Sequence, residues 1–175
     1  MSAAASTLSL EALITEFFQR SAGHWRSQRR YYTLKSGETQ EVISQLTTEF
    51  LTAEHDELAA LAKKHDLTVP LTCGVRATWE SSYISPSRKQ AKGSTVFGIL
   101  GEVLYRDRGF ATPKPVTATY QMRDLNTMQL HTEYGGSSFD EEIKLVGDSY
   151  RTRQTIISRA GEEIMIGQYL ETRQA

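Results

Sequence analysis

Cysteine is nearly absent from this sequence, because Cys73 is the single one among 175 residues. One cysteine excludes an internal disulfide, and the neighbours Leu71, Val75 and Ala77 are typical of a small side chain in an apolar core. We therefore expect a protein of a reducing compartment, the cytoplasm, in which Cys73 contributes to packing.

An excess of charge of one sign is also missing. The 20 basic and 21 acidic side chains nearly cancel, and neither sign forms a long run. Proteins that bind nucleic acid or an anionic membrane usually carry a broad basic surface. We therefore expect no nucleic acid partner and predict that partners are recognised locally.

The first 18 residues do not resemble a targeting segment. They lack basic residues, and Glu11 and Glu16 interrupt their apolar stretch. A signal peptide begins with positive charge, and a membrane span needs a longer apolar run. We expect a soluble chain without membrane insertion.

Several catalytic motifs are missing as well. His24, His55, His65 and His131 lie in separate segments without cysteine or carboxylate at metal-ligand spacing, so no metal site is expected. The sequence has no glycine-rich phosphate loop and no G-x-S-x-G elbow. These absences argue against the common hydrolase and nucleotide-binding classes.

Two segments have helical periodicity. From about residue 8 to 20, apolar side chains recur at three-and-four spacing after Ser9 or Thr7, either of which can cap the start, with Gly23 beyond the end. From about 52 to 65, acidic residues come early and lysines late, as the helix dipole prefers. We predict an amphipathic helix in each.

Most of the remaining chain alternates between apolar and polar residues with period two, which indicates strands joined by short hairpins. The turns are rich in glycine, asparagine and aspartate. Closing so many strands into a barrel removes exposed edges. We predict a mostly all-β fold, an antiparallel up-and-down barrel from about Arg29 to Arg173 within one domain spanning 1–175, with the first helix at one mouth. The predicted strands are Glu41 to Leu51, Leu71 to Tyr83, Ser94 to Leu100, Val116 to Met122, Met128 to Tyr134, Phe139 to Val146, Tyr150 to Ser158 and Glu163 to Glu171.

A few charged residues share the apolar, inward face of these strands. Glu141 alternates with Phe139 and Ile143. In the next strand neither face is cleanly apolar, but if Ile157 points inward, Arg151 and Arg153 do too, and the short Gly147-Asp148 hairpin lets them approach Glu141.

Such charges allow two interpretations. They form a structural ion pair inside a filled barrel, or they bind a ligand with acidic arms, because an unpaired buried charge is costly and guanidiniums suit carboxylates. Trp79 points to the same interior and is either a core residue or a surface for a flat conjugated ligand. The charged stretch Leu104 to Phe110 is either a solvated rim loop or a docking loop for a client.

Several short motifs, in this order and spacing, resemble the CpcS/CpeS-type (S/U-type) phycobiliprotein lyases over nearly the whole chain. They are Phe17-Phe18, Ser21-Ala22-Gly23, Trp25, Ser27-Gln28-Arg29, Gly93-Ser94-Thr95, Tyr105-Arg106-Asp107-Arg108-Gly109-Phe110, Thr132-Glu133-Tyr134 and Arg151-Thr152-Arg153-Gln154-Thr155.

The resemblance implies a lipocalin-like (calycin) barrel of about ten strands that binds an open-chain tetrapyrrole, most often phycocyanobilin, as substrate. It implies thioether attachment of this bilin to a cysteine of an apo-phycobiliprotein, of the phycocyanin or allophycocyanin type, with no permanently bound cofactor. The family's catalytic positions fall on Glu141, Arg151 and Arg153. Its bilin-binding positions also include residues elsewhere, namely Trp79, His24, Trp25, Arg29 and Tyr134.

The residues Arg29-Arg30-Tyr31-Tyr32 resemble the U-type branch, some members of which act only as a heterodimer with an S-type partner. A homodimer or such a heterodimer is therefore expected as one possibility. A bilin carrier without catalytic activity, or a barrel for another acidic apolar ligand, remain alternatives.

Overall fold

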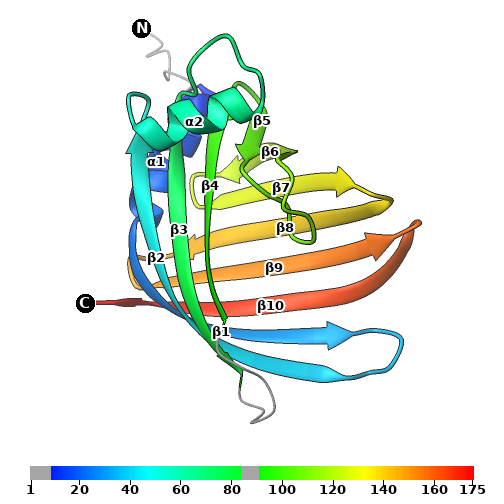
Figure 1. The fold of residues 1–175 in the computed structure, drawn as a ribbon. Coiled ribbons are helices and arrows are strands. Elements are labelled where there is room, and N and C mark those ends of the chain that lie inside the picture. The colour runs from blue at the N-terminus through cyan, green and yellow to red at the C-terminus, as the bar shows by residue number, and fades with distance from the viewer. Residues whose placement is uncertain (1–8, 84–90) are drawn as a thin grey trace, which may run out of the picture.

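A computed structural model describes residues 9–83 and 91–175 (Figure 1). Helix α1 spans Leu10–Ser21, and the Ser9 hydroxyl caps it by accepting a hydrogen bond from the Ala12 amide (3.2 Å). Helix α2 spans Asp56–Lys64. Among the described residues, no helix is long and apolar enough to cross a membrane.

In the part of the chain that the structure describes, ten strands form one closed antiparallel barrel, which confirms the predicted fold. Each strand pairs with the next along the chain, and β1 closes the sheet by pairing with β10. The strands are β1 (Gly23–Thr33), β2 (Thr39–Thr52), β3 (Cys73–Tyr83), β4 (Ala91–Leu100), β5 (Val103–Arg106), β6 (Val116–Asp124), β7 (Thr127–Tyr134), β8 (Ser137–Val146), β9 (Tyr150–Arg159) and β10 (Glu162–Gln174).

The hairpin turns lie where the sequence predicts them. Gly135 and Gly136 join β7 to β8 with positive φ angles of 59° and 77°. Ala160 adopts φ 51° between β9 and β10, although it carries a side chain, and Gly161 follows at 80°. Left-handed backbone of this kind matches the twist of the flanking strands.

Several strand ends differ from the sequence predictions by one to three residues, and three differences are larger or change the kind of element. The barrel begins at Gly23, not near Arg29, because residues 23–33 pair with both β2 and β10. Helix α2 begins at Asp56, because β2 continues to Thr52. The stretch that begins at Leu104 is not entirely a loop, because Val103–Arg106 pairs with β4 and β6.

Helix α1 closes one end of the barrel with the apolar side chains Ile14, Phe17 and Phe18, all buried (Figure 1). Polar contacts attach the start of the helix to the wall. The carboxylate of Glu11 accepts hydrogen bonds from the Gly101 amide (2.6 Å) and the Thr72 hydroxyl (2.9 Å). The sequence prediction of a helix at one mouth is therefore correct.

The other end of α1 is held by Arg173 of β10. Its guanidinium donates to the carbonyl oxygens of Arg20 and Ala22, each at 2.6 Å, and to that of Asp148 at 2.7 Å. The last carbonyls of a helix lack intrahelical partners, and a cation suits that end of the helix dipole. Arg173 thus fixes the helix at the end that borders the interior.

Helix α2 packs on the outside of the barrel over β3 and β4. Gly74 and Gly98 pair across these strands, and a Cβ at Gly74 would lie 2.5 Å from Leu58 Cδ2. The two glycines therefore allow the helix to approach the sheet closely. A separate apolar cluster fills this contact, made of Leu51, Leu58, Leu61, Ala62 and Leu71.

Candidate functional site

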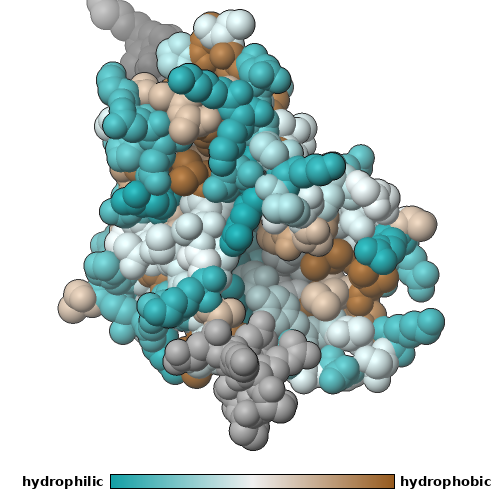
Figure 2. Space-filling view, viewed as in Figure 1, coloured by the Kyte–Doolittle hydropathy of each residue, from teal (hydrophilic) through white to brown (hydrophobic). Residues whose placement is uncertain are grey.

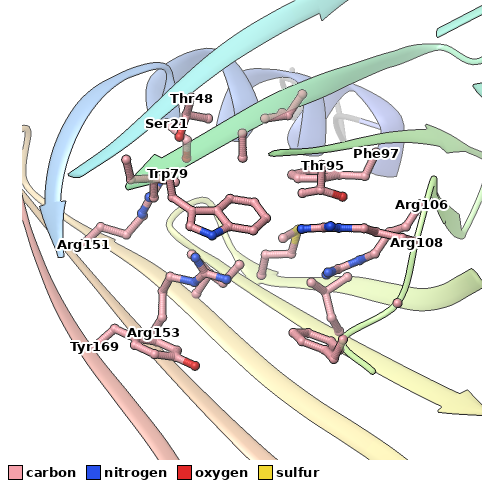
Figure 3. Close-up of a pocket in the computed structure, with 18 of the residues that line it drawn as sticks. Ser21, Thr48, Trp79, Thr95, Phe97, Arg106, Arg108, Arg151, Arg153 and Tyr169 are labelled. Atoms are coloured by element: carbon pink, nitrogen blue, oxygen red, sulfur yellow. The ribbon is translucent and has the colours of Figure 1, made fainter. Parts of the chain in front are cut away.

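A cavity of about 540 Å³ occupies the barrel interior beside α1 (Figure 3). This volume falls in the usual range for a small-molecule pocket. The space-filling view shows the front face of the barrel hollowed near its centre (Figure 2). The walls are mainly aromatic and aliphatic side chains together with five arginines. The aromatic residues are Phe17, Phe18, Tyr31, Trp79, Phe97, Phe110 and Tyr169, and the arginines are Arg29, Arg106, Arg108, Arg151 and Arg153.

The barrel register explains how distant segments supply this lining. Arg153 on β9 pairs with Tyr169 on β10, and Tyr169 pairs with Arg29 on β1. Both guanidiniums lie against the Tyr169 ring, at 5.4 Å and 5.3 Å from its centroid. Side chains of paired residues point to the same face, so one cross-strand row brings two cations to one aromatic ring.

Among the described residues, no carboxylate lines the cavity, although five guanidiniums do. Two buried glutamates, Glu141 and Glu171, lie behind the arginine side chains. Five positive charges against two negative ones leave the site with an excess of positive charge. Such a surface favours an anionic ligand, most strongly one that carries more than one acidic group.

Glu171 is the partner of Arg151. Arg151 Nε donates to Glu171 Oε1 at 2.7 Å, and both side chains are almost fully buried. Burial alone would raise the pKa of Glu171, but the guanidiniums of Arg151 and Arg153 outweigh burial and hold that pKa below its ordinary value. Glu171 is therefore an anion that fixes Arg151 in the cavity wall.

Glu141 pairs with Arg106, not with the arginines of the neighbouring strand. Arg106 Nη2 lies 3.4 Å from Glu141 Oε2, and the glutamate side chain is 2 % exposed. The sequence prediction that Glu141 points inward is correct. The prediction that Arg151 approaches Glu141 is wrong. Arg151 is opposite Leu145 and pairs with Glu171, while Glu141 is opposite Thr155.

Several buried polar atoms of these groups have no hydrogen-bond partner within the described residues. They are Arg106 Nε, Arg153 Nε, Glu141 Oε1, Glu171 Oε2 and Ser21 Oγ. Buried polar atoms are rarely left without a partner, and each one costs free energy. Three of them belong to residues that line the cavity, Ser21, Arg106 and Arg153, so the described residues alone do not satisfy all the polar groups around it.

Trp79 points into the cavity, with Arg151 on one side and Arg106 and Arg108 on the other (Figure 3). The guanidinium of Arg108 lies 5.2 Å from the centroid of its ring. Trp79 pairs with Gly93 across β3 and β4, and a Cβ at Gly93 would lie 2.3 Å from Trp79 Cζ2. The indole therefore occupies space that a side chain at position 93 would fill.

Of the other residues predicted from sequence, Arg29 lines the cavity and three do not. His24 is exposed on the outer face of β1, where its Nδ1 shares a hydrogen bond with the Thr47 hydroxyl (3.0 Å). Trp25 is buried between the guanidiniums of Arg151 and Arg173, at 4.5 Å and 4.3 Å, outside the cavity lining.

Tyr134 lies near the cavity but supports its wall. Its hydroxyl accepts a hydrogen bond from the Ala111 amide (2.7 Å), and its ring stacks on Phe139. Phe110 also stacks on Phe139, with 4.8 Å between the ring centroids. Tyr134 thus positions the segment after β5, which contributes Phe110 to the lining.

Sequence reasoning missed four residues of this arrangement: Arg106, Arg108, Tyr169 and Glu171. One signal was available for Glu171, because it alternates in phase with Gly167 and Tyr169 on an inward strand face. No comparable signal was available for Arg106 and Arg108. Their segment looked like a charged loop, and charges in loops usually face solvent.

Cys73 has the expected packing role. It is 2 % exposed within the apolar core, and its Sγ lies 3.4 Å from the Thr15 hydroxyl of α1. Burial raises the pKa of this thiol, which keeps it protonated and unreactive. Over residues 9–83 and 91–175, no group of three or more potential metal ligands occurs.

Comparisons with known proteins show the family of this chain. The family model described as "CpeS-like protein" matches residues 13–174. The protein CpcS 2 of Nostoc sp. strain PCC 7120, named as a phycocyanobilin lyase with the qualifier "Putative", is 58 % identical over 93 % of this chain and 92 % of its own length. A chromophore lyase CpcS/CpeS 2 of Trichodesmium erythraeum is 32 % identical over 83 % of this chain and 79 % of its own.

A solved structure has the same fold. The S-type phycobiliprotein lyase CpeS from Guillardia theta superposes with a TM-score of 0.79 at 26 % identity and covers 93 % of each chain. Because the family model spans almost the whole sequence and the relatives align over most of both chains, this chain belongs to the CpeS-like protein family.

Proposed function

We propose that this chain is a bilin lyase of the cytoplasm. It binds an open-chain tetrapyrrole in the arginine-lined cavity and catalyses thioether attachment of this substrate to a cysteine of an apo-phycobiliprotein subunit. The relatives are named as phycocyanobilin and chromophore lyases, and the solved relative is an S-type phycobiliprotein lyase. The preferred substrate we propose is phycocyanobilin.

The observation that carries this proposal is the composition of the cavity wall. Of residues 9–83 and 91–175, five arginines and seven aromatic residues line it, and no carboxylate does. A bilin has a long conjugated system and two propionates. Guanidiniums bind carboxylates with two parallel hydrogen bonds, and aromatic rings accept a flat conjugated ligand by stacking. The cavity therefore offers both chemistries in one space.

We assign the propionates to Arg151 and Arg153, with Arg29 as a further cation. Arg153 is suited to this role because its side chain lines the cavity and makes no hydrogen bond or ion pair within the described residues; its contact is the Tyr169 ring. Arg151 is held by Glu171 through Nε. The terminal nitrogens of the Arg151 guanidinium stay available for a ligand carboxylate.

The attacking thiol belongs to the client protein. Cys73 is the single cysteine of the chain, and its thiol is buried. In the reaction the client's sulfur bonds to the ethylidene carbon of the bilin A-ring, and the double bond takes up a proton. This addition has no leaving group and no net redox change. We propose Glu141 as the group that hydrogen-bonds the pyrrole N–H groups or moves this proton.

Reconstitution tests the proposal directly. The chain, alone and with an S-type partner, is incubated with phycocyanobilin or phycoerythrobilin and with apo-subunits of phycocyanin and allophycocyanin. We expect a fluorescent adduct that stays on the client after denaturation. The Cys73→Ala variant serves as control and should remain active. Absence of an adduct under all these conditions would contradict a lyase function.

One observation favours a second candidate, a bilin carrier that holds the substrate while attachment proceeds without its catalysis. Glu141 is not part of the cavity surface, and it pairs with Arg106, which is. The Glu141→Gln variant separates the two functions. A catalytic Glu141 predicts a lower rate of adduct formation at saturating bilin with unchanged binding, whereas a carrier predicts that both fall together.

The oligomeric state of the chain is a separate proposal. We propose that the chain acts as a homodimer or as a heterodimer with an S-type lyase. Size-exclusion chromatography of the chain alone, and after mixing with the S-type partner, measures this. A monomer in both samples with full lyase activity would contradict it.

A further inference from the structure

Arg108 is held more weakly than Arg29, Arg106 and Arg151. Arg106 and Arg151 form ion pairs with glutamates, and Arg29 donates to the Ser27 hydroxyl. Arg108 has no hydrogen bond or ion pair within the described part of the chain. Its contact is the face of Trp79, with the guanidinium carbon 5.2 Å from the ring centroid. Arg153 also makes no hydrogen bond or ion pair within the described residues, and its contact is the Tyr169 ring at 5.4 Å.

The backbone around Arg108 is fixed, in contrast to its side chain. The Asp107 amide donates to the Val96 carbonyl (3.0 Å), and the Asp107 carboxylate accepts from the Thr95 hydroxyl (2.6 Å). On the other side, the Gly109 amide donates to the Thr112 carbonyl (3.0 Å). The side chain can therefore rotate away from Trp79 without movement of the segment.

The indole of Trp79 is confined by the sheet as well. A Cβ at Gly93 would lie 2.3 Å from Cζ2, 2.6 Å from Cε2 and 3.0 Å from Nε1, so this edge of the ring lies against β4. The ring cannot move toward the strand to make room for a ligand. A flat ligand that stacks on the exposed part of Trp79 competes with the Arg108 guanidinium for that space.

A single cation–π contact is weak compared with a charge-assisted pair between guanidinium and carboxylate. A ligand that carries both a conjugated plane and an acidic arm can replace the first contact and provide the second. A ligand with the plane alone displaces the guanidinium and leaves it without a partner in the cavity.

We propose that Arg108 is a gate and specificity residue that covers Trp79 in the free protein, leaves the ring when a conjugated acid binds, and pairs with a carboxylate of that ligand. This inference rests on the proposed function, because it takes the ligand to be a bilin. It adds a residue that selects acidic planar ligands over neutral ones of the same shape.

Stopped-flow and equilibrium binding of phycocyanobilin and of its dimethyl ester test the gate. The ester keeps the conjugated plane and lacks both charges. In the Arg108→Ala variant we expect association of both compounds to become faster, because Trp79 is no longer covered. Affinity for the free acid should fall about tenfold or more, as for a lost hydrogen bond between charged groups, while affinity for the ester should be unchanged or higher.

Arg123→Ala is the matched control, since Arg123 is 69 % exposed on β6 and outside the cavity lining. This variant should bind both compounds with the affinity and association rate of the wild type. If Arg108→Ala lowers the affinity for acid and ester equally, or leaves association unchanged, the gate is contradicted while bilin binding stands. If the wild type binds neither compound, both the gate and the proposed function are contradicted.

Discussion

Arg106 and Glu141 form an ion pair across the interior of the barrel, although their strands, β5 and β8, are not neighbours in the sheet. The Glu141 side chain is 2 % exposed and that of Arg106 is 12 % exposed, so water screens the pair poorly. A second buried pair, Arg151 with Glu171, lies on adjacent strands. The interior thus holds two ion pairs whose side chains are largely shielded from solvent.

Breaking the first pair should destabilise the fold. Arg106→Met leaves Glu141 buried without its cation, and loss of one partner of a buried pair typically costs about 3–5 kcal/mol. We expect a decrease of this size in the free energy of unfolding, measured by urea denaturation at pH 7. The double variant Arg106→Met with Glu141→Leu should recover most of the loss, because no unpaired charge remains.

The exposed pair of Arg30 with Glu41 is the matched control. Its side chains are 52 % and 41 % exposed, and surface pairs contribute about 0–1 kcal/mol. Arg30→Met should therefore change stability little. Equal effects of Arg30→Met and Arg106→Met on stability would show that burial of the Arg106–Glu141 pair is unimportant.

Glu171 should make stability depend on pH in the acid range. Its pKa is held below the ordinary value of 4.5 in the folded state, because the adjacent guanidiniums outweigh burial. A depressed folded pKa contributes stability that is present above the unfolded pKa and is lost as pH falls through the folded pKa. We expect the stability advantage of the wild type over Glu171→Gln to be constant above about pH 5 and to shrink below pH 4.5.

Denaturant unfolding between pH 7 and pH 3 measures this difference. Glu49→Gln is the control, because the pKa of Glu49 is also lowered, first by its hydrogen bond to Arg76, yet its side chain is 46 % exposed. Solvent screening should keep its effect small. A difference between wild type and Glu171→Gln that does not vary with pH would contradict an ionised Glu171.

Gly93→Ala should disturb the ligand site through Trp79. The added Cβ would overlap Cζ2 and Cε2, so the indole must shift or rotate. We expect phycocyanobilin affinity to fall about tenfold, as for the loss of one aromatic contact of about 1.4 kcal/mol. Ser94→Ala, at the neighbouring exposed position, is the control. Equal affinities of both variants for bilin would indicate that Trp79 does not contact the ligand.

Arg173→Met should loosen helix α1 without changing ligand charge selectivity. The substitution removes three hydrogen bonds to the carbonyls of Arg20, Ala22 and Asp148 and retains an aliphatic contact with Trp25. We expect a loss of about 1–3 kcal/mol in unfolding free energy. The ratio of affinities for phycocyanobilin and its dimethyl ester should not change. A changed ratio would mean that Arg173 acts on the ligand site directly.

The sequence predicted the fold well because its signal is local. Alternation of apolar and polar residues every second position defines a strand face, and glycine-rich turns place the hairpins. For this reason Glu141 was correctly assigned to the inward face from Phe139 and Ile143 alone. The short strand β5 was missed, because four residues are too few to display a period.

The sequence by itself determined the closed barrel, the helix at its mouth and the inward direction of Glu141, since each follows from residues close together in the chain. It left open which face of the next strand looks inward, and the structure places Arg151 and Arg153 in the cavity wall. Only the tertiary structure decided which charges meet. Barrel closure and register bring Arg106 to Glu141 and Arg108 to Trp79 from strands and segments far apart in sequence. Such contacts depend on the positions of side chains across the interior, which no periodicity along one strand contains.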